Sequence, residues 1–140
     1  MRWVYDDGGR AAEGRRKGAR DCVVRALAIA TPMEYQVAYA RVGSALRECS
    51  AALYGATPSQ GVPRRLHHDL FPNLGWLWTP TMGIGTGCRV HLRDGELPLG
   101  RLIVQCSHHL VAVLDGVIHD TENPSREGTR CVYGYWRKQE

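Results

Sequence analysis

The sequence predicts an α+β fold in which helices from the N-terminal half pack on an antiparallel sheet from the C-terminal half. Before Gly75, apolar residues recur at helical spacing, whereas after it short apolar runs alternate with turn residues. Helices followed by consecutive strands are typical of this fold class. A length of 140 residues, with 44% hydrophobic and 23% charged residues, suits a globular chain with one core. Residues 1–140 are therefore expected to form a single domain.

Three helices are expected in the first half. Asp21 is a favourable N-cap, so the first helix should begin at Cys22, and the run VVRALAIA that follows is apolar on nearly every side, as in a buried helix. Residues 31–34, TPME, match a capping box with proline at the first helical position, and they predict a second helix. A third, shorter helix should begin at Pro63 and stop at Pro72. The apolar stripe of the second helix is Tyr35, Tyr39, Val42 and Leu46.

Short strands are expected after Gly75. Asp115-Gly116 is a strong signal for a two-residue hairpin turn between the runs HLVAVL and VIHDT. Trp76 and Trp78 are expected to pack in the core or on the sheet rather than to line a cleft. The predicted strands are residues 75–81, 88–92, 101–106, 109–114, 117–121 and 131–136, with residues 1–5 as a further short strand.

Charge and cysteine content narrow the class of protein. The formal net charge of +4 comes largely from residues 8–20, GGRAAEGRRKGAR, which are expected to form a solvated arm or surface loop. The first 20 residues contain no apolar run that would predict a signal peptide, and the longest apolar runs have five residues, too few to span a membrane. An odd number of cysteines at scattered spacings predicts reduced thiols in the cytoplasm rather than a disulfide framework. The cysteines are Cys22, Cys49, Cys88, Cys106 and Cys131.

The hairpin register distinguishes among three histidines. With a turn at Asp115-Gly116, His109 and Asp120 become diagonal neighbours on one side of the sheet, about 7 Å apart at Cα. A hydrogen bond between the imidazole and the carboxylate can span that separation. His108 and His119 fall on the opposite side. The selected pair matches the base and the orienting acid of a nucleophile–base–acid triad.

Cys22 is the candidate nucleophile for that triad. At a helix N-terminus the partial positive charge favours the thiolate, and a nearby imidazolium favours it further. Asp21 opposes this effect, so the sequence leaves the direction of the thiol pKa open. A single cysteine in an apolar helix is more often an inert buried thiol, and a single strand histidine is more often structural. Their joint occurrence in the order Cys22, His109, Asp120 favours catalysis.

This order resembles papain-like cysteine peptidases, whose nucleophile begins the central helix and whose histidine and Asp or Asn lie on the following sheet. The chain is also similar to small uncharacterised phage and prophage proteins of that kind, in the segments WVYDDGGR, DCVVRALAIAT, GWLWTPTMGIGTGCRVHL, ELPLGRLIV, HLVAVLDGVIHDT and PSREGTRCVYGYW. The likeness covers nearly the whole chain except residues 47–74. It implies a papain-like fold with Cys22 as nucleophile, His109 as base and Asp120 as orienting residue.

Two positions of the papain-like pattern, the orienting residue and the oxyanion donor, have more than one candidate in this chain. Asn123 is a rival orienting residue, since papain itself uses an asparagine, although the hairpin register places it opposite His108. Papain-like peptidases usually carry a glutamine about six residues before the cysteine to bind the oxyanion, and here Arg16 occupies that position. The oxyanion would then be bound by the Cys22 backbone N–H and a second donor, either Lys17 or Arg16.

The predicted function is cleavage of an amide, isopeptide or thioester bond through an acyl-thioester on Cys22, completed by water or, in a transferase, by an amine. A peptide or protein is the expected substrate, in the host cytoplasm and including host proteins if the chain is phage-encoded. No cofactor, metal ion or membrane is expected to take part. Nucleic acid is disfavoured because no basic and aromatic residues interleave along the chain.

Two other interpretations stay open. A catalytically weak or inactive papain-like module could bind a host protein through residues 10–20. A zinc site is the second alternative, although the chain has no Cys-x-x-Cys pair of the usual kind. Its candidate ligands are Cys88, His91, Cys106 and His108, with His67 and His68 in addition.

Overall fold

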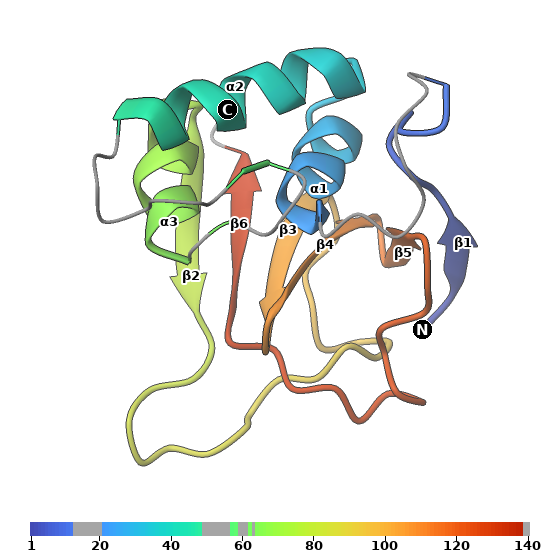
Figure 1. The fold of residues 1–140 in the computed structure, drawn as a ribbon. Helices are drawn as coiled ribbons and strands as arrows, with labels where there is room; N and C mark the ends of the chain where they lie inside the picture. The colour runs from blue at the N-terminus through green and yellow to red at the C-terminus, as the bar shows by residue number, and fades with distance from the viewer. Residues whose placement is uncertain (13–20, 49–56, 59–61, 63, 139–140) are drawn as a thin grey trace.

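Three helices cover one face of a six-stranded sheet in the computed structural model, which describes residues 1–12, 21–48, 57–58, 62 and 64–138 (Figure 1). The predicted α+β class is confirmed. The helices are α1 (Cys22–Ala30), α2 (Tyr35–Glu48) and α3 (Arg64–Asn73). The strands are β1 (Trp3–Tyr5), β2 (Trp76–Pro80), β3 (Arg101–Cys106), β4 (His109–Leu114), β5 (Val117–Asp120) and β6 (Gly134–Lys138), in the sheet order β1-β5-β4-β3-β6-β2.

The hairpin of β4 and β5 has the predicted register. Asp115 and Gly116 form its turn with positive φ angles of 48° and 79°, and Leu114 pairs with Val117. β4 also pairs with β3, so it lies inside the sheet with a neighbour on each side. Residues 110–113 of β4 are all buried, which explains why this run is continuously apolar instead of alternating.

The sheet is mixed rather than purely antiparallel as predicted. β1 pairs with β5 in the parallel sense, with Tyr5 opposite Asp120. The short run MRWVY carries no signal of strand direction, because only contacts with distant parts of the chain decide it. The pairing brings the N-terminal segment to the end of β5, where the Asp6 N–H bonds to the Asp120 carbonyl.

Residues 88–92 and the start of the last predicted strand do not join the sheet ladder. They form an isolated bridge between His91 and Cys131, and β6 begins at Gly134. A disulfide joins Cys88 to Cys131, with the two Cα atoms 5.8 Å apart. The prediction that the cysteines are all reduced is therefore wrong. A sequence separation of 43 residues leaves no local sign of this pairing, which depends on how the fold brings two connecting segments together.

Two helix boundaries also differ from the prediction. α2 begins at Tyr35 rather than at Pro32, because the Met33 N–H bonds to a carbonyl in the last turn of α1 and so closes that helix. α3 continues through Pro72 and ends at the next residue, so the proline lies in the last turn instead of stopping the helix. Pro63, its predicted first residue, lies outside the described residues.

Two apolar layers flank the sheet, one beneath the helices and one on the opposite face. α1 is buried on nearly every side, as predicted, and Trp76 is part of the core. None of the helices in the described part of the chain combines the length and the apolar character needed to cross a membrane. The helix-side layer includes Val24, Leu27, Phe71, Ile103, Ala112 and Trp136. The opposite layer includes Leu92, Leu102, Val104, Val111, Ile118 and Val132.

Candidate active site

The three residues predicted to form a triad lie at the ends of neighbouring elements. Cys22 is the first residue of α1, His109 is the first residue of β4, and Asp120 is the last residue of β5. Because β4 and β5 are antiparallel, the beginning of one and the end of the other lie at the same end of the sheet. α1 packs against β4, and the Cys22 thiol interacts with the His109 ring.

His109 and Asp120 make the predicted contact. His109 Nε2 lies 2.6 Å from Asp120 Oδ2, and the Thr121 N–H donates to Asp120 Oδ1 at 2.7 Å. Asn123, the rival orienting residue, is exposed and accepts a hydrogen bond from the Ser125 N–H instead. Asp120 is therefore the acid in contact with the histidine.

The other two histidines of this region lie elsewhere. His108 is exposed in the turn between β3 and β4, where its φ is 54°. His119 Nδ1 lies 3.1 Å from Asp6 Oδ2, in a separate pair. The register of the hairpin thus separates His109 from His119, as predicted, whereas His108 is excluded by its place in the turn before β4 and not, as predicted, by facing the other side of the sheet.

The surroundings of Cys22 favour its thiolate. Burial alone raises the pKa of this thiol. A hydrogen bond with His109 and the charge of that ring act in the opposite direction, and the Leu110 backbone N–H and the charge of Arg25 add to them. The pKa of Cys22 is lowered overall, which answers the question that the neighbouring Asp21 left open.

The pKa values of the other two triad residues, His109 and Asp120, are shifted in opposite directions. Burial lowers the pKa of His109, but the hydrogen bonds with Asp120 and Cys22 and the charges of both groups together outweigh burial and raise the pKa from 6.5 to about 9. Burial raises the pKa of Asp120, but the hydrogen bond and charge of His109, followed by the charge of Arg25, bring it below its usual range. These directions favour an imidazolium flanked by a thiolate and a carboxylate at neutral pH.

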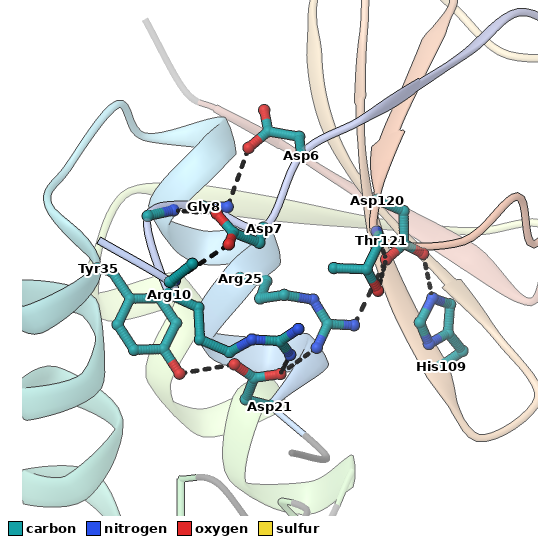
Figure 2. Close-up of polar contacts among 12 residues, drawn as sticks. Asp6, Asp7, Gly8, Arg10, Asp21, Arg25, Tyr35, His109, Asp120 and Thr121 are labelled. Carbon is teal, nitrogen blue, oxygen red and sulfur yellow. Dashed lines mark hydrogen bonds and ion pairs between the residues drawn. The ribbon is translucent and has the colours of Figure 1, made fainter. Parts of the chain in front are cut away.

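A buried cluster of charges lies beside these residues, centred on Asp21 (Figure 2). The Asp21 carboxylate is fully buried and accepts hydrogen bonds from Arg10 at 3.0 Å, from Arg25, and from the Tyr35 hydroxyl at 2.6 Å. Two features of this cluster differ from the predictions. Asp21 precedes α1, but its side chain binds these donors and does not cap the helix. Arg10 is buried by its ion pair instead of belonging to a solvated arm, whereas residues 13–20 of that segment lie outside the described residues.

Arg25 connects the Asp21 cluster to the histidine–aspartate pair. Its Nη1 contacts Asp21, and its Nη2 lies 3.4 Å from Asp120 Oδ1. The residue is only 7% exposed. Sequence reasoning missed Arg25, although two signals were present. It is the only polar residue in an apolar helix, and it follows Asp21 by four residues, the spacing of a helical ion pair.

The predicted zinc ligands do not gather at one place. Cys88 is in the disulfide, His108 is exposed, and burial raises the pKa of the Cys106 thiol to about 11. His67 Nε2 instead lies 3.1 Å from Gln105 Oε1, and burial lowers the pKa of His67 to about 4. Across the residues that the structure describes, no three side chains of His, Cys, Asp or Glu are grouped to hold a metal ion.

One of the predicted oxyanion donors, the Cys22 backbone N–H, lies within the described residues. Arg16 and Lys17 lie outside the described residues, as does Cys49. Cys22 begins α1, so its backbone N–H has no acceptor within the helix and is the kind of donor that binds a developing negative charge.

Comparisons with protein families, with curated proteins and with solved structures find no match to this chain. The geometry of the site itself indicates what chemistry it can support. A thiol with a lowered pKa, an imidazole and a carboxylate follow one another in contact, which is the arrangement of a nucleophile with an oriented base.

Proposed function

We propose that the protein is a papain-like thiol hydrolase of the cysteine peptidase or amidase type, which acts through an acyl-thioester on Cys22. The observation that carries this proposal is the 2.6 Å contact between His109 and Asp120 beside a thiol whose pKa is lowered. An inert buried thiol behaves differently, as Cys106 illustrates with a pKa raised to about 11. The proposed substrate is a peptide or protein.

The proposed cycle begins from the thiolate–imidazolium pair. The Cys22 thiolate attacks the carbonyl carbon, which forms a C–S bond and places negative charge on the carbonyl oxygen. The C–N bond then breaks while His109 donates the proton of Nδ1 to the leaving amine, because Nε2 is engaged by Asp120. Neutral His109 next takes a proton from water as the water attacks the thioester. The C–S bond breaks, and the thiolate–imidazolium pair is restored.

The negative charge on the carbonyl oxygen needs donors that are already in place. The Cys22 backbone N–H at the start of α1 is the first proposed donor. Arg16 or Lys17 is the proposed second donor. Losing one oxyanion donor typically costs about 100- to 1000-fold in turnover, so Arg16→Ala and Lys17→Ala, measured separately, should identify which residue acts.

An acyl-transfer assay with p-nitrophenyl acetate tests the proposal without a known substrate. We expect release of p-nitrophenolate and an acetyl group on the Cys22 peptide, detected by mass spectrometry. Cys22→Ser and His109→Ala should each abolish both signals while the circular dichroism spectrum stays that of the wild type. His108→Ala is the matched control, since that side chain is exposed in the turn next to His109.

Two results would contradict the proposal. One is acetylation that is no faster at Cys22 than at Cys106. The other is equal loss of activity in His108→Ala and His109→Ala. Rapid acetylation of Cys22 without release of acetate would instead indicate either a transferase that awaits an amine or an inactive binding module.

A further inference from the structure

Six ionisable side chains form one continuous series of contacts from the N-terminal segment to the thiol. Figure 2 shows the guanidinium of Arg25 between the two carboxylates, reaching from α1 toward the end of β5. The charges expected along the series alternate in sign. In the order of contact the members are Arg10, Asp21, Arg25, Asp120, His109 and Cys22.

Charge balance makes Arg25 the critical member of this series. With the thiolate–imidazolium pair formed, the series holds three positive and three negative charges. Buried charges are costly unless they are paired, so one missing charge affects all the others. Asp21 directly precedes Cys22, and its negative charge would oppose the thiolate if Arg25 and Arg10 did not neutralise it.

We propose that Arg25 is a positioning residue for the Cys22 thiolate. Its guanidinium bridges Asp21 and Asp120, so that it neutralises the charge of Asp21 beside the thiol and keeps Asp120 ionised for its contact with His109. The inference rests on the proposed function and deepens it by adding a residue of α1 to the site. Cys22 and Arg25 lie within one turn of the same helix, so the contact of Arg25 with β5 also fixes the nucleophile relative to the base.

The electrostatic surroundings support this role. The charge of Arg25 lowers the pKa of Cys22, after burial, the contacts with His109 and the Leu110 N–H, and it lowers the pKa of Asp120, after burial and the contacts with His109. Burial excludes water from the bridge, since Arg25 is 7% exposed and Asp120 is 4% exposed. Opposite charges in such surroundings shift a pKa by roughly 1 to 3 units, far more than on the surface.

Other charged or titratable groups face this series from the elements packed around it. Tyr35 contributes its hydroxyl to Asp21 from α2. Asp6, which is paired with His119, lies beside the end of β5. Cys106 of β3 pairs with His109, and burial raises the pKa of its thiol to about 11 although the charges of Arg130 and Arg126 act in the opposite direction. None of these groups is altered in the variants below.

The test is the pH dependence of Cys22 alkylation by iodoacetamide, followed on the Cys22 peptide by mass spectrometry. Arg25→Met removes a positive charge, so the alkylation midpoint should rise by about one pH unit and the rate below the wild-type midpoint should fall about tenfold. Arg25→Lys keeps the charge and should restore most of the low midpoint. Arg41→Met, at an exposed arginine of α2, is the matched control and should leave the midpoint unchanged.

A variant of opposite sign keeps the test decisive if Arg25→Met does not fold. Asp21→Asn removes a negative charge beside the thiol, so it should lower the Cys22 midpoint. The inference would be overturned if the Cys22 alkylation midpoint were unchanged in Arg25→Met, or if it rose in Asp21→Asn. An ordinary midpoint of about 8.5 in the wild type would instead overturn the proposed function, because the thiol would then be unactivated.

Discussion

Replacing Asp120 with asparagine keeps the shape of the side chain but removes the charge that His109 and Arg25 share. The carboxylate contacts His109 at 2.6 Å, the Thr121 N–H at 2.7 Å and Arg25 at 3.4 Å. The amide oxygen of asparagine can still accept from one of these donors, so we expect Asp120→Asn to fold. The missing charge should lower the pKa of His109 and the rate of turnover.

The magnitude follows from the pKa of His109. Its rise from 6.5 to about 9 corresponds to about 3 kcal/mol, at about 1.4 kcal/mol per pKa unit, and Asp120 is the largest of the causes that raise it, with Cys22 next. If Asp120 supplies about half of the rise, the pKa of His109 should fall by roughly one to two units in Asp120→Asn. Turnover should fall about 10- to 1000-fold, less than the roughly four orders of magnitude lost in a serine protease triad. The loss is smaller because the thiolate–imidazolium pair forms before the substrate arrives.

Nuclear magnetic resonance titration of the His109 ring measures the first effect, and the pH–rate profile measures the second. Because the imidazolium must donate a proton to the leaving group, the alkaline limb of the profile should move to lower pH in Asp120→Asn. A His109 pKa that remains near 9 in this variant would refute the reasoning. Asn123→Ala serves as the control, since Asn123 is exposed and contacts Ser125. Full activity in Asp120→Asn with none in Asn123→Ala would transfer the orienting role to Asn123.

Three further outcomes are expected. Brief iodoacetamide treatment at neutral pH, followed by peptide mapping, should label Cys22 well before Cys106, because the pKa of Cys22 lies below that of an ordinary thiol and the pKa of Cys106 lies above it. Equal labelling of the two would mean that Cys22 is only a structural cysteine. Because the pKa of His109 is raised in the folded state, its charge should stabilise the wild type fully below pH 6.5 and lose this effect as the pH rises through about 9. The Tm of the wild type should therefore exceed that of His109→Gln at low pH, and the difference should vanish above about pH 9. Reduction of the Cys88–Cys131 disulfide should lower the free energy of unfolding by about 2 to 4 kcal/mol in a denaturant titration, whereas no change would mean that the disulfide adds nothing to stability.

The sequence predicted those parts of the fold that local patterns determine. The start of α1 at Cys22 and the bounds of β3 and β4 follow from apolar runs and turn residues, and the dipeptide Asp115-Gly116 sets the register that joins His109 to Asp120. The remaining features depend on distant contacts. Local propensity makes an aspartate before a helix an N-cap, but the buried arginines compete successfully for the carboxylate of Asp21.

The position of Arg25 in α1 is hard to explain by folding alone. The other eight residues of the helix are apolar or Cys22, and buried ion pairs are often no more stabilising than apolar side chains of similar volume. Within an apolar helix, however, the same charge acts on its neighbours with little screening by water. Arg25 spans 95 residues of sequence to reach Asp120, and Asp120 in turn contacts the histidine that faces the thiol. The helix therefore presents its one buried charge at the place where it can favour a thiolate, and the same apolar surroundings that make this charge costly make its effect on Cys22 strong.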